Sequence, residues 1–442
     1  MRNSTRGPAP ARGTSRSARR PGPARRGRPA PNSAIRPRVR GANFGSRAEA
    51  VVAGSREFFL SAFRGQSREF TQLLGVTIAL LAIGTLMVLD ASYVNSLSAG
   101  SDAYSSGLRQ AILATVGFVV MTFVSGLPVY RIQQSARALM LGSMVLQVLT
   151  LLIGQSVNGN RNWLNIPLVG PVQPSEFMKL AIVLQVAAIL TETADGWNDF
   201  KYSWGKAIVW VALGAGLVII GSDLGTVIIM ALFVLIELAL AGLPRQWLNY
   251  ALLLGVVGAL VGSFSSPSRK ARTIAWLNPD APDPLDVNWQ AKHGIWALAA
   301  GGFGGVGLGQ SKMKWSWIPE VENDYIFAII GEEFGLVGSI VVIGLFVVLS
   351  VVLIRILRHT EDLWSRIVVG GVAGWLVIQA LVNIAVVLSL LPVLGVPLPL
   401  ISKGGSSLIS NLAAIGVVLA IERNNHSGPR AFNPRLAKAR RR

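Results

Sequence analysis

The stretch "LLGVTIALLAIGTLMVL", residues 73–89, contains no charged residue, and a similar run covers residues 208–222. About 20 mostly apolar helical residues cross the roughly 30 Å core of a bilayer. A helix also satisfies its own backbone polar groups, which lipid cannot do. Of the 442 residues, 51% are hydrophobic, and the mean hydropathy is +0.50. The sequence therefore predicts an all-α polytopic membrane protein rather than a soluble globular one.

About ten transmembrane helices are expected, separated by segments that carry Pro, Gly or charged residues. Together they form a membrane domain, 70–422, between two tails, 1–69 and 423–442. The expected helices span residues 71–94, 108–127, 136–154, 175–191, 204–220, 223–241, 246–264, 325–354, 365–391 and 406–422.

The orientation follows from the basic residues of the short connections, which favour the cytoplasmic side. If the N-terminus is inside, Arg131, Lys201, Arg245 and Arg355 all fall inside, and an even number of helices places the C-terminus inside too. Residues 265–324, between helices 7 and 8, then form a large extracytoplasmic loop. This loop is far longer than usual connections, and its apolar and glycine-rich patterns indicate packed, partly re-entrant structure.

The formal net charge of +19 belongs to the tails. Residues 1–69 hold 16 Lys and Arg against 3 Glu, residues 423–442 hold 7 basic residues and no acid, and residues 70–422 carry a net charge of −1. The Arg- and Pro-rich first tail is predicted to be disordered, because it has too few large apolar residues to form a core. It is either a solvated arm or a contact to anionic lipids. Nucleic acid, which could bind on charge alone, is not the expected partner.

Two classes of site are excluded by simple observations. The chain has no cysteine, so it has no disulfide framework and no thiolate metal site. The glycines of "GFGGVG", residues 302–307, match a dinucleotide-binding fingerprint formally, but no strand precedes them and no βαβ unit surrounds them.

Charged residues inside or at the ends of apolar runs are costly, and they indicate a cavity or a partner. Glu176 and Lys179 are three residues apart and lie on one helix face, so they either pair or contact a substrate. Asp223 stands at a helix start, where it would cap the helix. Glu332 and Glu333 lie one to two turns into an apolar run, which favours a polar cavity.

Two loops carry residues suited to a site. Lys403, Gly404, Gly405 and Ser406 precede or begin the last helix, where a cation, backbone amides and hydroxyls suit a phosphate. An ordinary N-cap by Ser406 or Ser407 explains the same pattern. In the long loop, Asp280, Asp283 and Asp286 stand beside prolines and are equivalent on spacing alone, either as turn residues or as catalytic candidates.

Taken together, the motifs resemble those of the SEDS family, which includes FtsW, RodA and SpoVE, over nearly all of residues 70–422. The resemblance implies a ten-helix fold that polymerises lipid II into glycan strands at the outer membrane face with a class B penicillin-binding protein. It rests on "VNGNRNWL", "QPSEFMKLA", "DLGT", "DPLDVNWQ", "GGFGGVGLGQSKMKWSWIPEVENDYIFAIIGEEFGLVG", "QALVNI" and "LPVLGVPLPLISKGGSSL".

The resemblance singles out Asp283 as the expected general base, which takes the proton of the acceptor hydroxyl. The pyrophosphate leaving group needs cations or a divalent metal, Mg²⁺ or Mn²⁺, to absorb charge. The expected cationic ligands of the substrate are Arg161, Lys179, Arg272, Lys314 and Lys403; Glu176, Glu320 and Asp324 would orient them, and Gly404, Gly405 and Ser406 would add a phosphate-binding turn.

This chain departs from the family pattern at several positions. Asp286 and Asn288 stand where the family usually has Gly, which bears on the geometry of the loop that holds Asp283. Asn162 stands where the family has an Arg, and the neighbouring Arg161 would take over the role of that Arg. Lys403 stands where the family commonly has a Tyr.

The basic N-terminal arm and "VQPSEFMKLA" are most similar to FtsW, so the expected function is septal peptidoglycan synthesis in the bacterial cytoplasmic membrane. A RodA-like polymerase for elongation, a lipid II flippase and a scaffold are the alternatives. The expected partners are lipid II, the nascent glycan strand, an FtsI-like class B transpeptidase, other division proteins and membrane lipids.

Overall fold

The computed structural model describes residues 67–98, 104–157, 160–166, 170–194, 204–279, 288–315, 317–318 and 321–426. The chain divides into two units, Met1–Ala53 and Gly54–Arg442, and every described residue belongs to the second. The N-terminal tail up to residue 66 and the C-terminal tail from residue 427 lie outside the described residues. So do Asp283 and Glu320.

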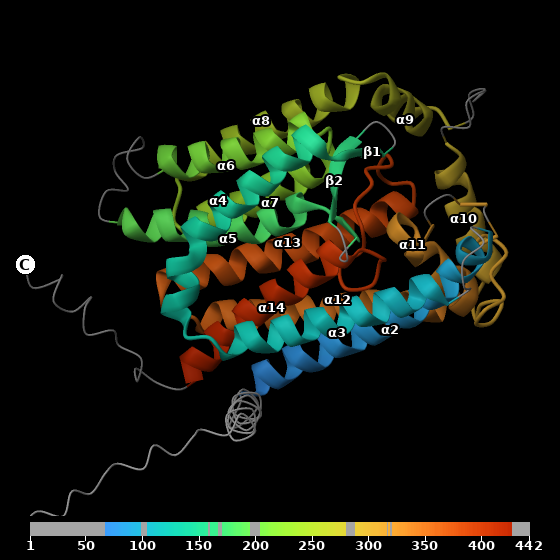
Figure 1. Ribbon diagram of the computed structural model, residues 1–442, viewed down its shortest axis with the longest axis horizontal. Coiled ribbons are helices and arrows are strands. Elements are labelled where there is room, and N and C mark those ends of the chain that lie inside the picture. The colour runs from blue at the N-terminus through green and yellow to red at the C-terminus, as the bar shows by residue number, and fades with distance from the viewer. Residues whose placement is uncertain are drawn as a thin grey trace, which may run out of the picture. The chain divides into compact units, whose positions relative to one another are not determined.

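Each expected apolar segment coincides with a long helix (Figure 1). Eight of the described helices are long and apolar enough to cross a membrane, while α6 and α7 are apolar but have 17 residues each. The polytopic helical fold is thus confirmed, and the number of spans stays a prediction. The helices are α2 (Arg68–Ser98), α3 (Ser105–Gly126), α4 (Val129–Ile153), α5 (Pro174–Glu192), α6 (Trp204–Ile220), α7 (Leu224–Leu240), α8 (Arg245–Phe264), α12 (Ile326–His359), α13 (Leu363–Val387) and α14 (Gly405–His426).

Helix ends differ from the expected ones where polar residues continue a helix. The third expected helix begins at 136, but α4 begins at Val129, directly after Pro128. Proline ends the preceding connection and is tolerated at a helix start. The polar first turns, "VYRIQQSAR", are therefore helical although they lack an apolar run.

The described part of the expected long loop, 265–324, contains three helices: α9 (Pro267–Leu277), α10 (Trp289–Gly301) and α11 (Val321–Asp324). Helix α9 begins with a proline in its first turn, and its Trp276 indole N–H donates to the carbonyl of Ser389 at 2.9 Å. Helix α10 packs on α12. The region is therefore packed against the bundle, as its apolar patterns indicate.

A small sheet, which the sequence does not reveal, connects α4 to α5. It is antiparallel, in the order β1 (Gln155–Val157), β2 (Asn160–Ile166) and β3 (Gly170–Val172). The backbone N–H of Arg161 donates to the carbonyl of Gly221 at 3.1 Å, which ties β2 to the turn between α6 and α7.

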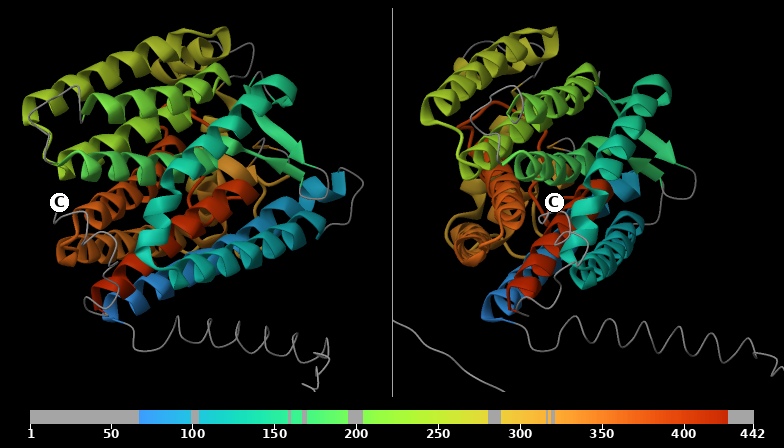
Figure 2. Two further views of the ribbon diagram at one scale, coloured as in Figure 1. Left: turned by 60° about the vertical axis from the view of Figure 1, so that its left-hand side comes forward. Right: turned by 90° about the vertical axis from the view of Figure 1, so that its left-hand side faces the viewer.

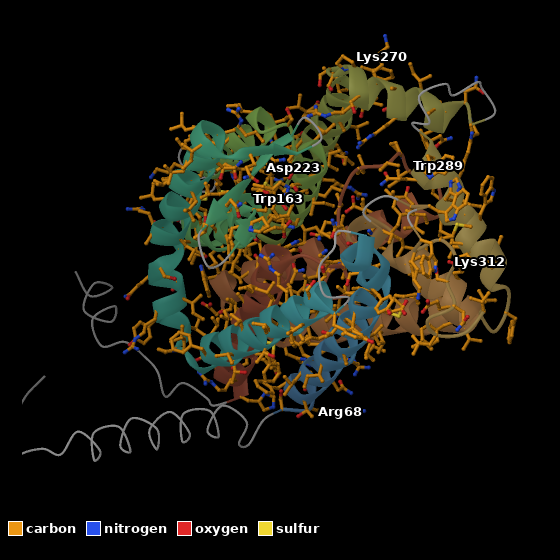
Figure 3. The ribbon with its side chains drawn as sticks, turned by 45° about the vertical axis from the view of Figure 1, so that its right-hand side comes forward. Arg68, Trp163, Asp223, Lys270, Trp289 and Lys312 are labelled. Atoms are coloured by element: carbon orange, nitrogen blue, oxygen red, sulfur yellow. The ribbon has the colours of Figure 1, made fainter. Side chains whose placement is uncertain are left out.

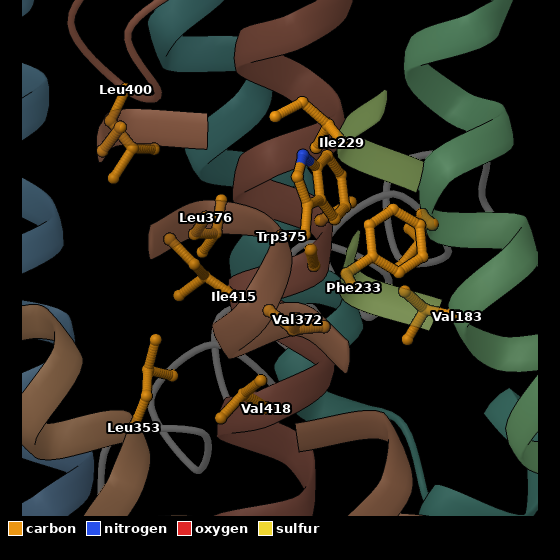
Figure 4. Close-up of a cluster of buried hydrophobic side chains, with 14 of the residues drawn as sticks. Val183, Ile229, Phe233, Leu353, Val372, Trp375, Leu376, Leu400, Ile415 and Val418 are labelled. Atoms are coloured by element: carbon orange, nitrogen blue, oxygen red, sulfur yellow. The ribbon is translucent and has the colours of Figure 1, made fainter. Parts of the chain in front are cut away.

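The core lies between α5, α7, α13 and α14. Figure 4 shows Val183, Phe233, Trp375 and Ile415, one from each of these helices, within a single apolar cluster. Helix α8 is the opposite case, because none of its residues is buried, and both views of Figure 2 place it at the edge of the bundle.

Helix α12 is interrupted at Gly335, whose backbone has a positive φ angle (φ 64°, ψ −157°). Such an interruption leaves amides and carbonyls without helical partners. Segment 302–307 provides partners: Leu336 N–H donates to Gly302 O at 2.9 Å, and Val306 N–H donates to Glu332 O at 3.0 Å. A glycine is required at position 335, because a side chain would meet the backbone of Phe303.

A buried ion cluster holds the following segment in place. The Lys314 ammonium, with 5% of its side chain exposed, lies 2.9 Å from Asp90 of α2 and 3.2 Å from Glu333 of α12. The neighbouring Glu332 carboxylate accepts the backbone N–H of Lys312 at 2.9 Å and the hydroxyl of Ser311. The cluster therefore joins two helices through the segment between α10 and α11.

Replacing Lys314 by methionine is expected to destabilise the protein by about 3–5 kcal/mol, because it leaves the buried Glu333 carboxylate and the partly buried Asp90 carboxylate without their cation. Thermal unfolding of the purified protein in detergent measures the effect. Lys312→Met is the matched control, since the Lys312 side chain is exposed, and it should change the midpoint little. Equal midpoints for the two variants would contradict a role for the ion cluster.

Candidate functional site

A cavity of about 710 Å³ lies where the ends of several helices meet. It is lined by residues of α3, α7, α9 and α14, by β2 and β3, and by the loop 392–404. Figure 3 shows two of its residues, Trp163 of β2 and Asp223 before α7. A concave pocket with convergent polar groups is the part of a protein most suited to bind a ligand.

Four basic side chains line the cavity: Arg109 of α3, Arg269 and Arg272 of α9, and Lys403. Arg269 donates to the carbonyl of Ser222 at 2.8 Å and to the hydroxyl of Ser265 at 3.1 Å. Because both acceptors are neutral, these bonds fix the guanidinium without cancelling its charge. The lining also holds Asp223 and Asp324, so its four basic side chains outnumber its two acidic ones, and such an excess favours an anion.

The N-terminus of α14 adds to this positive field. Gly404, Gly405, Ser406 and Ser407 all line the cavity, and the helix dipole favours an anion at this end. Because α14 begins at Gly405, Ser406 and Ser407 lie inside its first turn rather than at the N-cap position. The Ser406 hydroxyl oxygen accepts the backbone N–H of Gln173 at 2.9 Å.

Asp223 caps α7, which confirms the interpretation of its position as an N-cap. Its carboxylate accepts the backbone N–H of Thr226 at 3.0 Å, the Thr226 hydroxyl at 2.8 Å and the side-chain amide of Gln173 at 3.0 Å.

Lys403 is held in position by the short helix α11. Its backbone N–H donates to the carbonyl of Glu322 at 2.8 Å, and its ammonium lies 3.1 Å from the Glu322 carboxylate. A third of the Lys403 side chain, 34%, remains exposed. The next residues of α11, Asn323 and Asp324, line the cavity.

The structure brings only some of the sequence-predicted residues together. Arg161 donates to the carbonyl of Leu151 at 3.2 Å and is exposed outside the cavity lining. Lys314 belongs to the buried ion cluster, and Asp283 and Glu320 lie outside the described residues. The predicted residues that line the cavity are Arg272, Asp324, Lys403, Gly404, Gly405 and Ser406.

Glu176 and Lys179 form a buried ion pair of 2.9 Å, with 2% of each side chain exposed. The Lys179 ammonium also donates to Gln379 of α13 at 2.8 Å, and the Gln379 amide donates to Pro397 O at 2.9 Å. This geometry matches the pairing interpretation, because the pair faces protein rather than the cavity. It acts on the site by anchoring loop 392–404.

Sequence reasoning missed Arg109, Gln173 and Arg269. A signal for Arg269 existed, because it stands three residues before Arg272 on the same face of α9. No local signal marks Arg109, which packs against Gly170. The backbone of Gly170 has φ +93°, and a Cβ there would overlap the Arg109 guanidinium.

The charge of the cavity can be tested with a single cysteine, because the chain contains none. Gly404→Cys places a thiol on the cavity wall without strain, as the nearest atom to its Cβ is 3.5 Å away. An anionic methanethiosulfonate should react with it about tenfold faster than a cationic one at low salt, with a smaller ratio at high salt. Ser410→Cys, at a fully buried position, should react with neither. A faster cationic reagent would show that the cavity is not electropositive.

Comparisons with known proteins agree with this architecture. A family model for FtsW, RodA and SpoVE, described as "Cell cycle protein", matches residues 71–427. Stage V sporulation protein E of Bacillus subtilis is 34% identical over 353 residues, covering 79% of this chain and 96% of that protein. A probable peptidoglycan glycosyltransferase FtsW of Coxiella burnetii is 35% identical over 351 residues, covering 78% and 94%.

Solved structures share the fold. A chain from the structure described as "Structural coordination of polymerization and crosslinking by a peptidoglycan synthase complex" has a TM-score of 0.66 and 27% identity, covering 82% of this chain and 99% of that one. The rod shape determining protein RodA of Thermus thermophilus has a TM-score of 0.60 at 24% identity, covering 82% and 99%, and shows the fold alone. The sequence motifs, the helical bundle and these likenesses agree: the chain belongs to the FtsW/RodA/SpoVE family.

Proposed function

We propose that the chain is a peptidoglycan glycosyltransferase that polymerises lipid II into glycan strands during septal cell-wall synthesis. The observation that carries the proposal is the cavity, where Arg269, Arg272 and Lys403 meet the N-terminus of α14. A lipid-linked pyrophosphate is the kind of ligand that such a set of cations and amides binds. The FtsW relatives, which are probable peptidoglycan glycosyltransferases, support the same reaction.

The reaction joins two lipid-linked saccharides. The acceptor's 4-hydroxyl oxygen forms a bond to the anomeric carbon of the donor, the bond from that carbon to the pyrophosphate oxygen breaks, and the configuration inverts. The hydroxyl proton passes to a carboxylate, and the leaving pyrophosphate keeps the bonding electron pair. The protein therefore needs a base beside the acceptor and positive charge beside the pyrophosphate.

Asp283 is the proposed base. Its own position is outside the described residues, but both flanks of segment 280–287 reach the cavity. Arg272, which precedes the segment in the sequence, lines the cavity, and so does Gln290, which follows it. Asn288 also ties the start of α10 to α9, because its side-chain amide donates to Ala275 O at 3.2 Å.

Arg269, Arg272 and Lys403 are proposed to stabilise the negative charge that develops on the leaving pyrophosphate. A divalent cation remains part of the proposal. Among the described residues, no group of three or more His, Asp or Glu side chains is arranged to hold a metal ion. Mg²⁺ commonly binds through substrate phosphates and one or two carboxylates.

The partner and the place of the protein complete the proposal. The likeness to a chain of a peptidoglycan synthase complex supports a partner synthase, which we infer to be an FtsI-like class B transpeptidase. The apolar helices make the chain a multi-pass membrane protein. Cytoplasmic termini and a septal location are inferred from the basic short connections and from the FtsW relatives.

Elongation and transport are the competing functions. A RodA-like polymerase would use the same chemistry, and depletion in cells separates the two, since loss of septal synthesis gives filaments and loss of elongation gives rounded cells. A flippase would be expected to bind its substrate near mid-membrane. The charged cavity residues here stand at helix ends, in α9, before α7 and before α14, which favours chemistry at one membrane face.

Asp283→Asn is expected to lower polymerisation by about 10²–10⁴-fold, because the acceptor proton loses its base. The measurement is glycan polymer on a gel, made from lipid II by the full-length protein purified with its cognate transpeptidase. Asp280→Asn is the matched control in the same segment and should retain most activity. Undiminished polymer in Asp283→Asn would remove Asp283 as the base, and lipid II translocation in liposomes without any polymer would favour the flippase.

Arg272→Ala is expected to lower kcat/KM for lipid II by about 10–100-fold, because a charged hydrogen bond to the pyrophosphate is worth roughly 1.5–3 kcal/mol. Lys270→Ala is its control. Lys270 stands on the same helix but is exposed and is not part of the cavity lining. If the two variants lose activity equally, the effect comes from general charge near the membrane rather than from the cavity.

A further inference from the structure

Four aromatic side chains form a platform beside the cavity, which we define as Trp289, His293 and Trp296 of α10 with Trp317. Trp289 and Trp317 are nearly parallel, at 8° with ring centroids 5.9 Å apart. The His293 ring stacks on Trp289 at 4.0 Å, and Trp296 meets His293 edge-on at 4.6 Å. Three of the rings thus form a stack, with Trp296 edge-on against it, rather than separate surface residues.

The aromatic platform is rigid and yet open. His293, at its centre, is 3% exposed, while Trp317 and Trp296 remain 50% and 54% exposed. The Trp289 indole N–H donates to the carbonyl of Trp317, and His293 Nδ1 lies 2.9 Å from the carbonyl of Trp289. These bonds fix the ring planes, so the platform offers pre-oriented aromatic faces at little entropic cost.

The platform is connected to the cavity by residues that are its direct neighbours in the sequence. Gln290, which follows Trp289 directly, lines the cavity, and Asn288, which precedes it, is bonded to α9, the helix that carries Arg272. The start of α10 therefore contributes consecutive residues to both features, Trp289 to the platform and Gln290 to the cavity wall.

We propose that the aromatic platform binds the saccharide rings of the growing glycan strand, an inference that rests on the proposed function. A pyranose ring has a face of C–H groups, whose partial positive charge suits the negative face of an indole, and its burial removes apolar surface from water. The exposed Lys312 lies in the same segment, five residues before Trp317.

Two other occupants fit an exposed tryptophan less well. An indole at a membrane interface usually directs its N–H to the headgroups, whereas the Trp289 N–H is already bonded to a protein carbonyl. A protein partner commonly buries an aromatic anchor in a pocket, whereas these rings present stacked faces. Both alternatives remain outcomes of the test.

The test compares Trp317→Ala, Trp296→Ala and the conservative Trp317→Phe with unmodified protein, all as full-length chains purified with the cognate transpeptidase. Trp247→Ala of α8 is the matched control, as Trp247 is 43% exposed and pairs with Tyr250 away from the platform. Four quantities are measured: the length distribution of strands made from lipid II, the binding of a labelled, lipid-free glycan oligomer of four disaccharide units, the amount of co-purified transpeptidase, and the yield of reconstitution into vesicles.

Loss of one stacking contact corresponds to about a three- to tenfold weaker affinity. We expect both alanine variants to bind the oligomer that much more weakly and to make a correspondingly smaller share of long strands. Trp317→Phe should retain most of both, and the Trp247 control should match unmodified protein. Oligomer binding and strand length that are unchanged in both alanine variants would overturn the proposal.

Two further results would also overturn it. Loss of the co-purified transpeptidase with normal oligomer binding would make the platform a protein contact, and impaired reconstitution into vesicles with normal oligomer binding would make it a lipid contact. The failure of the proposed function looks different: unmodified protein would make no polymer from lipid II, and oligomer binding would still decide what the platform does.

Discussion

The buried Lys179 ammonium joins the parts of the bundle on which the cavity depends. It pairs with Glu176 on α5, donates to Gln379 on α13 and lies 4.9 Å from the centre of the Trp375 ring. Gln379 carries the contact on to loop 392–404, which reaches the cavity wall. Removing one partner from such a network leaves the others buried and unpaired, which costs far more than a surface ion pair is worth. The buried Glu176–Lys179 pair therefore supports the shape of the cavity although neither side chain lines it.

A second set of buried charges works in the same way at the break in α12. Broken helices are tolerated in membranes only where protein or water satisfies the freed backbone. Here segment 302–307 pairs with the break at Gly335, and Lys314, further along the same connection between α10 and α11, contacts Asp90 and Glu333. The same segment leads to Trp317, so the aromatic platform and the ion cluster belong to one packed unit.

The sequence predicts the helices well because a helix that crosses the lipid needs a long run of apolar residues, such as residues 73–89. It predicts the start of α4 poorly, because the polar turns after Pro128 are helical without such a run. For the site, the motifs pointed to Arg272, Asp324 and Lys403, which line the cavity. Arg109 could not be found, because its neighbour Gly170 is distant in sequence and adjoins it only once the sheet has formed.

Helix α8 has a consequence for how the membrane itself enters the site. None of its residues is buried, so its surface is left to lipid or to a partner protein. A helix of this kind adapts to a thinner or thicker bilayer by tilting, at a modest cost for each ångström of mismatch. Helix α9 follows α8 after Ser265 and Ser266 and carries Arg269 and Arg272. A tilt of α8 would therefore also shift the start of the helix that carries the basic wall of the cavity, which gives bilayer thickness a mechanical route to this site.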